Sequence, residues 1–225
     1  MKIVISPSKT MQESRAKSRR NPHFKAEKQT LLTYLQTMDQ PTLKRYLSLS
    51  DNLLNLNYNR YQNFDELHTA LNSYTGAQFK ALDYQSLSKT EKQFLDDHLY
   101  IISGLYGLVK PKDTIGLYRL PMALKYKDIP LTSYWKASIK SLLHDEVILN
   151  LASAEYSDAL DQSLTVINVK FDKAHSMVVK QLRGFMVRFI AEEKVTAVEP
   201  LKAFQALSYK FSYFDKKTNT LVYNK

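Results

Sequence analysis

The stretch Val147-Ile148-Leu149-Asn150-Leu151 predicts a buried strand, because aliphatic and β-branched residues dominate it. A second run of the same kind, Leu164-Thr165-Val166-Ile167-Asn168-Val169, follows shortly afterwards. Between the two runs, Ser153 to Leu160 is expected to form a helix of about two turns. A strand, a short helix and another strand indicate a local crossover unit within a mixed sheet.

Both ends of the chain add strands to this unit. Lys2 to Ile5 is an apolar run that stops at Ser6-Pro7, since proline lacks the N–H group that a ladder needs. A strand at the extreme start suggests an interior sheet position. At the other end, Tyr209 to Phe214 and Thr220 to Tyr223 predict a hairpin with a turn at Asp215 to Asn219.

Helical spacing dominates residues 24–74, where apolar residues recur at every third or fourth position. Breaks at Pro41 and near Asn55 divide the segment into three expected helices. Thr90-Glu91-Lys92-Gln93 has the spacing of a capping box and predicts a helix that ends at Gly104. Two further helices are predicted, one that begins at Thr132 or Ser133 and one over about Ala174 to Lys194.

These patterns predict an α+β protein with a mixed β-sheet flanked by helices. No repeat, low-complexity tract or Gly/Ser linker divides the 225 residues, so we expect a single domain over 1–225. Residues 12–22 contain no large apolar residue and are expected to form a basic loop.

Composition excludes several classes of protein. The chain has no cysteine, which excludes a disulfide scaffold, thiol peroxidase chemistry, iron–sulfur ligation by thiolates and cysteine-based zinc sites. The apolar run at the N-terminus is too short for a secretory signal, and no run of about eighteen apolar residues predicts a membrane helix. We therefore expect a soluble cytoplasmic protein.

The formal net charge is +10, and the excess lies at the two ends of the chain. Residues 1–28 carry eight basic and two acidic groups, residues 200–225 carry five and one, and residues 29–199 carry nineteen of each. If the fold brings the ends together, they form one electropositive surface that attracts phosphate backbones. Otherwise they are two solvated tails.

Gly104 and Gly107 are followed by Lys110 and Lys112 on either side of a proline. Glycines let backbone N–H groups face an anion, as in the helix-hairpin-helix turn that holds a DNA phosphate. The usual turn has one residue between its glycines, whereas this one has two. The alternative is a glycine C-cap followed by a reverse turn.

The long helix near the C-terminus has a basic face with Lys180, Arg183 and Arg188. Lys173 precedes the helix at roughly the same angle around its axis. A glycine inside a helix costs about 1 kcal/mol relative to alanine, so Gly184 indicates close approach by a ligand or another backbone. The alternative is a solvated basic face whose glycine admits a neighbouring helix.

Polar loops follow two of the predicted strands, and such loops commonly carry ligand groups. Ser153 has the alternative role of a helix cap. The possible ligand loops contain Ser6, Ser8, Lys9, Asn150, Ser153 and Glu155.

Familiar catalytic signatures are absent from the sequence, including the dinucleotide-binding glycine motif, the phosphate-binding loop, the serine elbow and the zinc-protease helix. Enzymatic activity is therefore left open. Asp172 and His175 have a conceivable metal-ligand spacing, but such a pair is more typical of a helix start. We expect no cofactor and no metal.

Five segments, in order along almost the whole chain, resemble the YaaA peroxide stress family. They are Ile3 to Thr10, Ile102 to Gly107 with Pro111, Tyr118 to Leu120, Asn150 to Ser153 with Glu155 and Tyr156, and Arg183 to Met186 with Arg188 to Ile190. After Tyr118-Arg119-Leu120 the chain has Pro121 where the family usually has an acidic residue. If that acid has a catalytic or ligand-orienting role in the family, this chain lacks it.

The resemblance implies a compact α+β domain with a basic cleft, a helix-hairpin-helix-like element and binding to DNA. Contacts to the backbone of duplex or distorted DNA, with little sequence specificity, are expected. It also implies protection against peroxide by keeping free intracellular iron low. The cleft residues that it indicates are Lys9, the turn from Gly104 to Gly107, Arg119, Lys180, Arg183 and Arg188.

Two other functions compete with DNA binding. One is an enzyme that acts on a small anionic substrate bound at the strand-end loops near Lys9 and Arg183. The other is an interaction protein without either activity.

Overall fold

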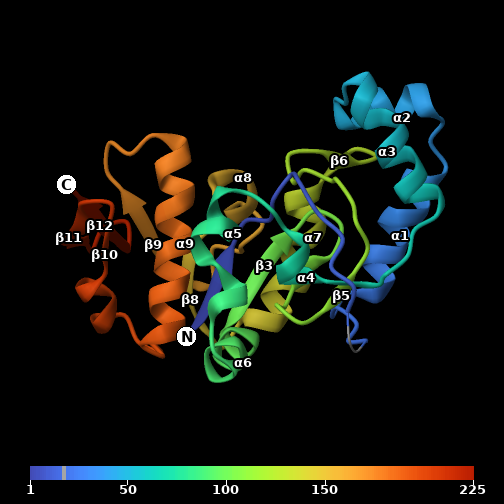
Figure 1. Cartoon of the computed structure of the whole chain (residues 1–225). Coiled ribbons are helices and arrows are strands. Elements are labelled where there is room, and N and C mark those ends of the chain that lie inside the picture. Colours follow the sequence, from blue (N-terminus) through green and yellow to red (C-terminus); the bar gives the residue numbers. More distant parts are fainter. Residues whose placement is uncertain (17–18) are drawn as a thin grey trace.

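The computed structural model describes residues 1–16 and 19–225, so Lys17 and Ser18 of the predicted basic loop lie outside the described residues. Its centre is an eight-stranded sheet with the order β10-β11-β12-β9-β8-β1-β3-β4 (Figure 1). The strands of this sheet are β1 (Lys2–Ile5), β3 (Leu99–Ser103), β4 (Gly107–Val109), β8 (Val147–Leu151), β9 (Thr165–Phe171), β10 (Gln205–Ala206), β11 (Tyr209–Asp215) and β12 (Thr220–Asn224). Two small sheets pair β2 (His68–Thr69) with β5 (Thr114–Ile115), and β6 (Lys125–Tyr126) with β7 (Ile129–Pro130).

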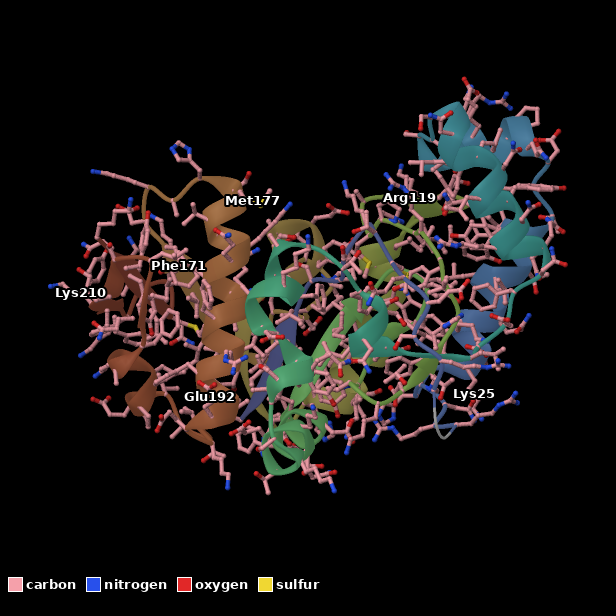
Figure 2. All side chains as sticks on the ribbon, viewed as in Figure 1. Lys25, Arg119, Phe171, Met177, Glu192 and Lys210 are labelled. Atoms are coloured by element: carbon pink, nitrogen blue, oxygen red, sulfur yellow. The ribbon has the colours of Figure 1, made fainter. Side chains whose placement is uncertain are left out.

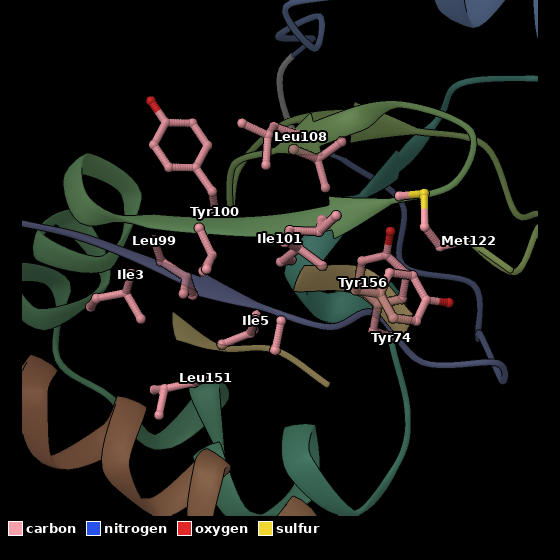
Figure 3. Packing of buried hydrophobic residues seen from close by; sticks show 14 of the residues in the cluster. Ile3, Ile5, Tyr74, Leu99, Tyr100, Ile101, Leu108, Met122, Leu151 and Tyr156 are labelled. Carbon is pink, nitrogen blue, oxygen red and sulfur yellow. The ribbon is translucent and has the colours of Figure 1, made fainter. Parts of the chain in front are cut away.

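The interior position predicted for β1 is confirmed. This strand pairs in parallel with β3 on one side and with β8 on the other. Its residues Ile3, Val4 and Ile5 are fully buried, and Figure 3 shows Ile3 and Ile5 among the apolar side chains of the neighbouring strands. The crossover unit is also confirmed, because β8 and β9 are parallel and are joined through α8 (Ala154–Ser157).

Helices pack around this sheet, and the mixed α/β architecture predicted from the sequence is observed. Figure 1 shows α1, α2 and α3 together at one end of the molecule and α9 between α5 and the C-terminal strands. The helices are α1 (Lys25–Gln36), α2 (Gln40–Leu47), α3 (Asp51–Gln62), α4 (Ala70–Ser73), α5 (Ala77–Leu82), α6 (Lys89–His98), α7 (Leu131–Leu143) and α9 (Ser176–Glu192), with 3-10 turns η1 (Tyr84–Ser86) and η2 (Glu199–Ala203).

The first three helices are found, but one of their predicted boundaries is wrong. The chain breaks at Ser48, which has a left-handed φ of 50°, and Asn55 lies inside α3. Pro41 lies in the first turn of α2, where its missing N–H group breaks no helical hydrogen bond. The helical pattern predicted over residues 24–74 also includes residues that are not helical, because residues 68–69 form strand β2.

The helix predicted to end at Gly104 ends at His98 instead. Its capping box is formed by Ser88 and Glu91: the Glu91 amide donates to Ser88 Oγ (3.3 Å) and the Ser88 amide donates to Glu91 Oε2 (2.7 Å). Every residue of β3 is buried, and a strand buried on both faces is a continuous apolar run. Periodicity does not separate such a run from buried helix.

The helix-hairpin-helix-like element expected around Gly104 and Gly107 is a β-hairpin in the structure, since β3 and β4 pair antiparallel on either side of the turn. The amides of Leu105 and Tyr106 donate to Ser103 Oγ (3.2 and 3.0 Å). Gly107 has a φ of +70° and lies against the Trp135 ring, where a Cβ would lie 2.5 Å from a ring carbon. The turn is therefore part of the core.

Gly184 allows α9 to approach α5 closely. A Cβ at this position would overlap the carbonyl oxygen of Gln78 and lie 2.8 Å from Ala81 Cβ. Of the two explanations for a glycine inside this helix, the neighbouring helix is the observed one.

Arg20 ties the predicted basic loop to α6 and to the segment between β4 and β5. Its Nε donates to Asp113 Oδ1 (2.7 Å) and its Nη2 donates to Asp96 Oδ1 (2.6 Å). Both carboxylates are buried. Burial alone would raise the pKa of Asp96, but the hydrogen bond and charge of Arg20 outweigh it and hold that pKa below its ordinary value.

Among the described residues, no helix combines the length and apolar character needed to cross a bilayer.

We expect Gly184→Ala to destabilise the protein, because the added methyl group meets backbone of α5 and forces the two helices apart. Overpacking of this kind costs about 1–3 kcal/mol, and the higher helix propensity of alanine offsets about 1 kcal/mol of it. Urea denaturation followed by circular dichroism measures the change. A clear gain in stability would contradict the packing of α9 on α5.

Arg20→Ala leaves two buried carboxylates without their cation, and we expect a loss of about 2–4 kcal/mol at pH 7. The folded-state pKa of Asp96 is depressed, so its contribution is present above the unfolded pKa and is lost as the pH falls through the folded one. Burial already raises the pKa of Asp113, and loss of Arg20 raises the pKa of both carboxyl groups further in the variant. The stability difference between wild type and variant should therefore shrink steadily as the pH falls from about 7 to about 3 and the carboxyl groups become protonated. Urea denaturation between pH 3 and pH 7 tests this, and a difference that does not change with pH would contradict it.

Candidate functional site

The connections that leave β1 and β8 lead in opposite directions along the sheet, toward its two different edges. From β1 the chain continues to β3 on one side, whereas from β8 it continues through α8 to β9 on the other. In open parallel sheets, ligands bind outside the carboxyl ends of two adjacent strands whose connections diverge in this way. The topology therefore indicates a site beyond Ile5 and Leu151.

A cavity of about 420 Å³ opens at this place, within the size range of small-molecule sites. Four segments line it: residues 6–10 after β1, residues 76–79 at the start of α5, residues 153–156 after β8, and one face of α9. From α9 the lining side chains are Met177, Lys180 and Arg183. Figure 2 shows Met177 at the upper end of α9, and its side chain is 58% exposed.

Hydrogen bonds tie the two strand-end loops together. Ser6 Oγ accepts from the Ser153 amide (2.8 Å) and lies 3.1 Å from Ser153 Oγ. Gln78 Nε2 donates to the carbonyl oxygen of Ser6 (3.2 Å), which attaches α5 to the same point. The inner part of the cavity is thus built from contacts between segments that are far apart in the sequence.

A second set of contacts holds the outer part of the first loop. Ser8 Oγ donates to the Thr75 carbonyl oxygen (3.1 Å), and Thr75 Oγ1 donates to Thr10 Oγ1 (2.9 Å). A Cβ on Gly76 would lie 2.9 Å from Ser8 Oγ, so glycine permits this close approach. Lys9 projects from a loop that is fixed on both sides.

Three cations line the cavity: Lys9, Lys180 and Arg183. The two lysines are exposed and the arginine is half-buried. Within the described ranges, no carboxylate forms an ion pair with any of the three. Burial lowers the pKa of Arg183, yet a guanidinium remains charged at every physiological pH. A desolvated cation without a counter-ion is suited to receive an anionic ligand.

Glu155 and Tyr156 supply groups of a different kind. Glu155 Oε1 is buried and, in the part of the chain that the structure describes, has no hydrogen-bond partner. Burial raises the pKa of Tyr156, and the nearby Glu155 charge raises it further, so the phenol keeps its proton. Figure 3 shows Tyr156 beside Tyr74 at the end of the central strands.

Other basic residues predicted for the site lie away from this cavity. Arg188 is held by acids: its Nε lies 2.8 Å from Glu192 Oε1 and its Nη1 lies 3.6 Å from Asp83 Oδ2. Lys112 Nζ donates to Gln93 Oε1 (2.6 Å), and Lys110 Nζ lies 5.5 Å from the centre of the Tyr100 ring. These contacts fix neighbouring elements to each other.

The remaining candidates are not among the residues that line the cavity. Asn150 Nδ2 donates to Asn168 Oδ1 (2.9 Å), which joins β8 to β9. Arg119 is linked through its backbone to the Tyr61 hydroxyl, and Lys173 lines a separate hollow near the C-terminus. Gly104 and Gly107 belong to the buried β3–β4 turn described above.

The two basic ends of the chain lie apart. Figure 2 places Lys25, from the first basic segment, and Lys210, from the last, at opposite ends of the molecule. The cations that converge are Lys9 from the first segment and two residues of α9, whose surrounding segment is balanced in charge. The excess of positive charge at the two ends of the chain therefore does not predict where the cations converge.

Sequence reasoning missed residues 75–79 and Met177. Residues 75–79 carry no motif and no charge excess, and their only signal in the sequence is Gly76, one of five glycines in the chain. Nothing in the sequence distinguishes Met177 from the other apolar residues of its helix. In residues 1–16 and 19–225 no cluster of three or more histidine, cysteine, aspartate or glutamate side chains is placed to hold a metal ion.

Comparison with known proteins finds relatives that the chain matches over nearly their whole length. The model of the family described as "Peroxide stress protein YaaA" matches residues 1–214. A UPF0246 protein of Rickettsia peacockii (strain Rustic) is 32% identical over 247 aligned residues, with both chains covered completely. A UPF0246 protein of Desulfitobacterium hafniense (strain Y51) is 34% identical over 246, covering 100% of this chain and 98% of that protein.

Proposed function

We propose that this chain, which belongs to the YaaA family of peroxide stress proteins, acts in peroxide protection. It does so by binding an anionic ligand in the cavity beyond β1 and β8. Arg183 carries the proposal. It is a half-buried cation with no acidic partner among the described residues, and it faces the same hollow as Lys9 and Lys180.

A phosphate group suits these three cations. Arginine donates in a fork that matches two phosphate oxygens, whereas lysine acts as a point charge. We assign Arg183 the inner contact and the two exposed lysines the contacts near the mouth of the cavity. Under the hypothesis of an enzyme with a small anionic substrate, Glu155 and Tyr156 are the groups beside the ligand that can accept or donate a proton.

Arg183→Gln should weaken the binding of inorganic pyrophosphate about 10- to 100-fold, since a hydrogen bond to a charged group contributes about 1.5–3 kcal/mol. Isothermal titration calorimetry at low salt measures this. Arg45→Gln removes the same charge from an exposed position on α2 and should leave the affinity unchanged. Equal affinities for wild type and Arg183→Gln would exclude Arg183 as the anion contact.

DNA is the second candidate ligand, favoured by the exposure of Lys9 and Lys180 and by the net charge of +10. Phosphates of a long polyanion can reach these lysines from solvent, with backbone contacts and little reading of sequence. We propose duplex or distorted DNA as this ligand. The further proposal that the protein keeps free iron low has its support in family membership alone.

The affinity for duplex DNA should fall with salt, because each neutralised phosphate releases about 0.9 counterion. The double variant Lys9→Ala with Lys180→Ala should then make the slope of log K, the association constant, against log salt concentration less steep by about 1.8. Fluorescence anisotropy with duplex, bubble and single-stranded DNA at several salt concentrations gives the slopes.

The control for this series is Lys89→Ala, at an exposed position at the start of α6. It should change the slope by less than half of the change that the double variant produces. Failure of all three DNA forms to bind at low salt would reject DNA as the ligand.

A further inference from the structure

We infer that the anionic ligand of this cavity is a phosphate monoester that also carries an N–H group, and that this group donates to Glu155. This inference rests on the proposed function, because it names the chemical class of ligand for the same site. It assigns Glu155 a binding role that complements Arg183.

The first observation is the unsatisfied oxygen of Glu155. Its Oε1 is buried and, among the residues described, receives no hydrogen bond. Buried polar atoms in folded proteins almost always have a partner, so an exception that lines a cavity marks the place where a ligand supplies one. A carboxylate oxygen only accepts hydrogen bonds, and the ligand atom that meets it must therefore be a donor.

The second observation is the separation of opposite charges within one cavity. Glu155 lines the same hollow as Lys9, Lys180 and Arg183, yet the described chain shows no ion pair between it and any of them. The cations and the carboxylate thus remain available to two different parts of a ligand. One part is anionic and the other donates a hydrogen bond.

The third observation concerns charge and size. Three cations complement the double charge of a phosphate monoester better than the single charge of a carboxylate. A cavity of about 420 Å³ also leaves space beyond a phosphate group. We therefore favour a phosphate ester with an amino group over an amino acid, which shares the pattern of anion and donor.

Paired probes that differ only in the donor provide the test. 2-Aminoethyl phosphate is compared with ethyl phosphate, and adenosine 5′-monophosphate with purine riboside 5′-monophosphate, which lacks the exocyclic amine. Calorimetry with wild-type protein should show at least tenfold tighter binding of the amino-bearing member in at least one pair. L-Aspartate tests the amino acid source, and it should bind more weakly than the preferred phosphate ester.

The variant Glu155→Leu, whose side chain has no hydrogen-bond acceptor, should reduce this preference to less than threefold while it retains the affinity for the probe without an amine. Glu193→Gln removes an exposed carboxylate at the end of α9 and should leave the preference intact. Equal binding within both pairs by the wild type overturns the inference without any variant, and a preference that survives in Glu155→Leu overturns it as well. Tighter binding of L-aspartate than of either phosphate ester overturns the phosphate class.

The proposed function fails in a different way. If inorganic pyrophosphate binds and loses affinity in Arg183→Gln, anion binding holds and only the donor contact is at issue. If neither pyrophosphate nor any phosphate ester binds, the anion site and the inference built on it fall together.

Discussion

The parallel pairing of β1 with both β3 and β8 is the constraint on which the rest of this structure depends. The strand is only four residues long, and it is buried on both faces between its two neighbours. Because the chain leaves β1 and β8 in opposite directions along the sheet, an opening forms between their diverging connections at the carboxyl ends of the two strands. The cavity is a direct consequence of this strand order.

Close packing of α5 on α9 completes the walls of the opening. Gly184 lets the two helices approach, and this approach places Gln78 where its side chain reaches the carbonyl oxygen of Ser6. Arg183 and Arg188 lie five residues apart on α9 but differ in their surroundings. Arg188 forms ion pairs with Asp83 and Glu192, whereas Arg183 is half-buried and has no ion pair among the described residues. This difference is why Arg183, and not Arg188, is proposed as an anion contact.

Local patterns predicted much of the fold, because they rest on interactions between near neighbours in the chain. The apolar runs around Ile148 and Val166 identified the crossover unit, the turn at Asp215 to Asn219 identified the hairpin, and the run before Pro7 identified an interior strand. The failure at Leu99 to Ser103 has burial on both faces as its cause. This segment lacks the alternation that separates a strand from a helix, so its pattern predicts a continuation of the preceding helix.

The sequence by itself determined the strand-end positions of Ser6, Lys9, Ser153 and Glu155, because each follows a short apolar run rich in valine, isoleucine and leucine, a composition that favours a buried strand. It also determined the amphipathic helix that carries Arg183. Only the tertiary structure decided which cations share a cavity and which are neutralised, and it alone brought residues 75–79 to the site. The physical reason is that strand and helix propensities act over a few residues, whereas a cavity forms where segments far apart in the chain are packed together.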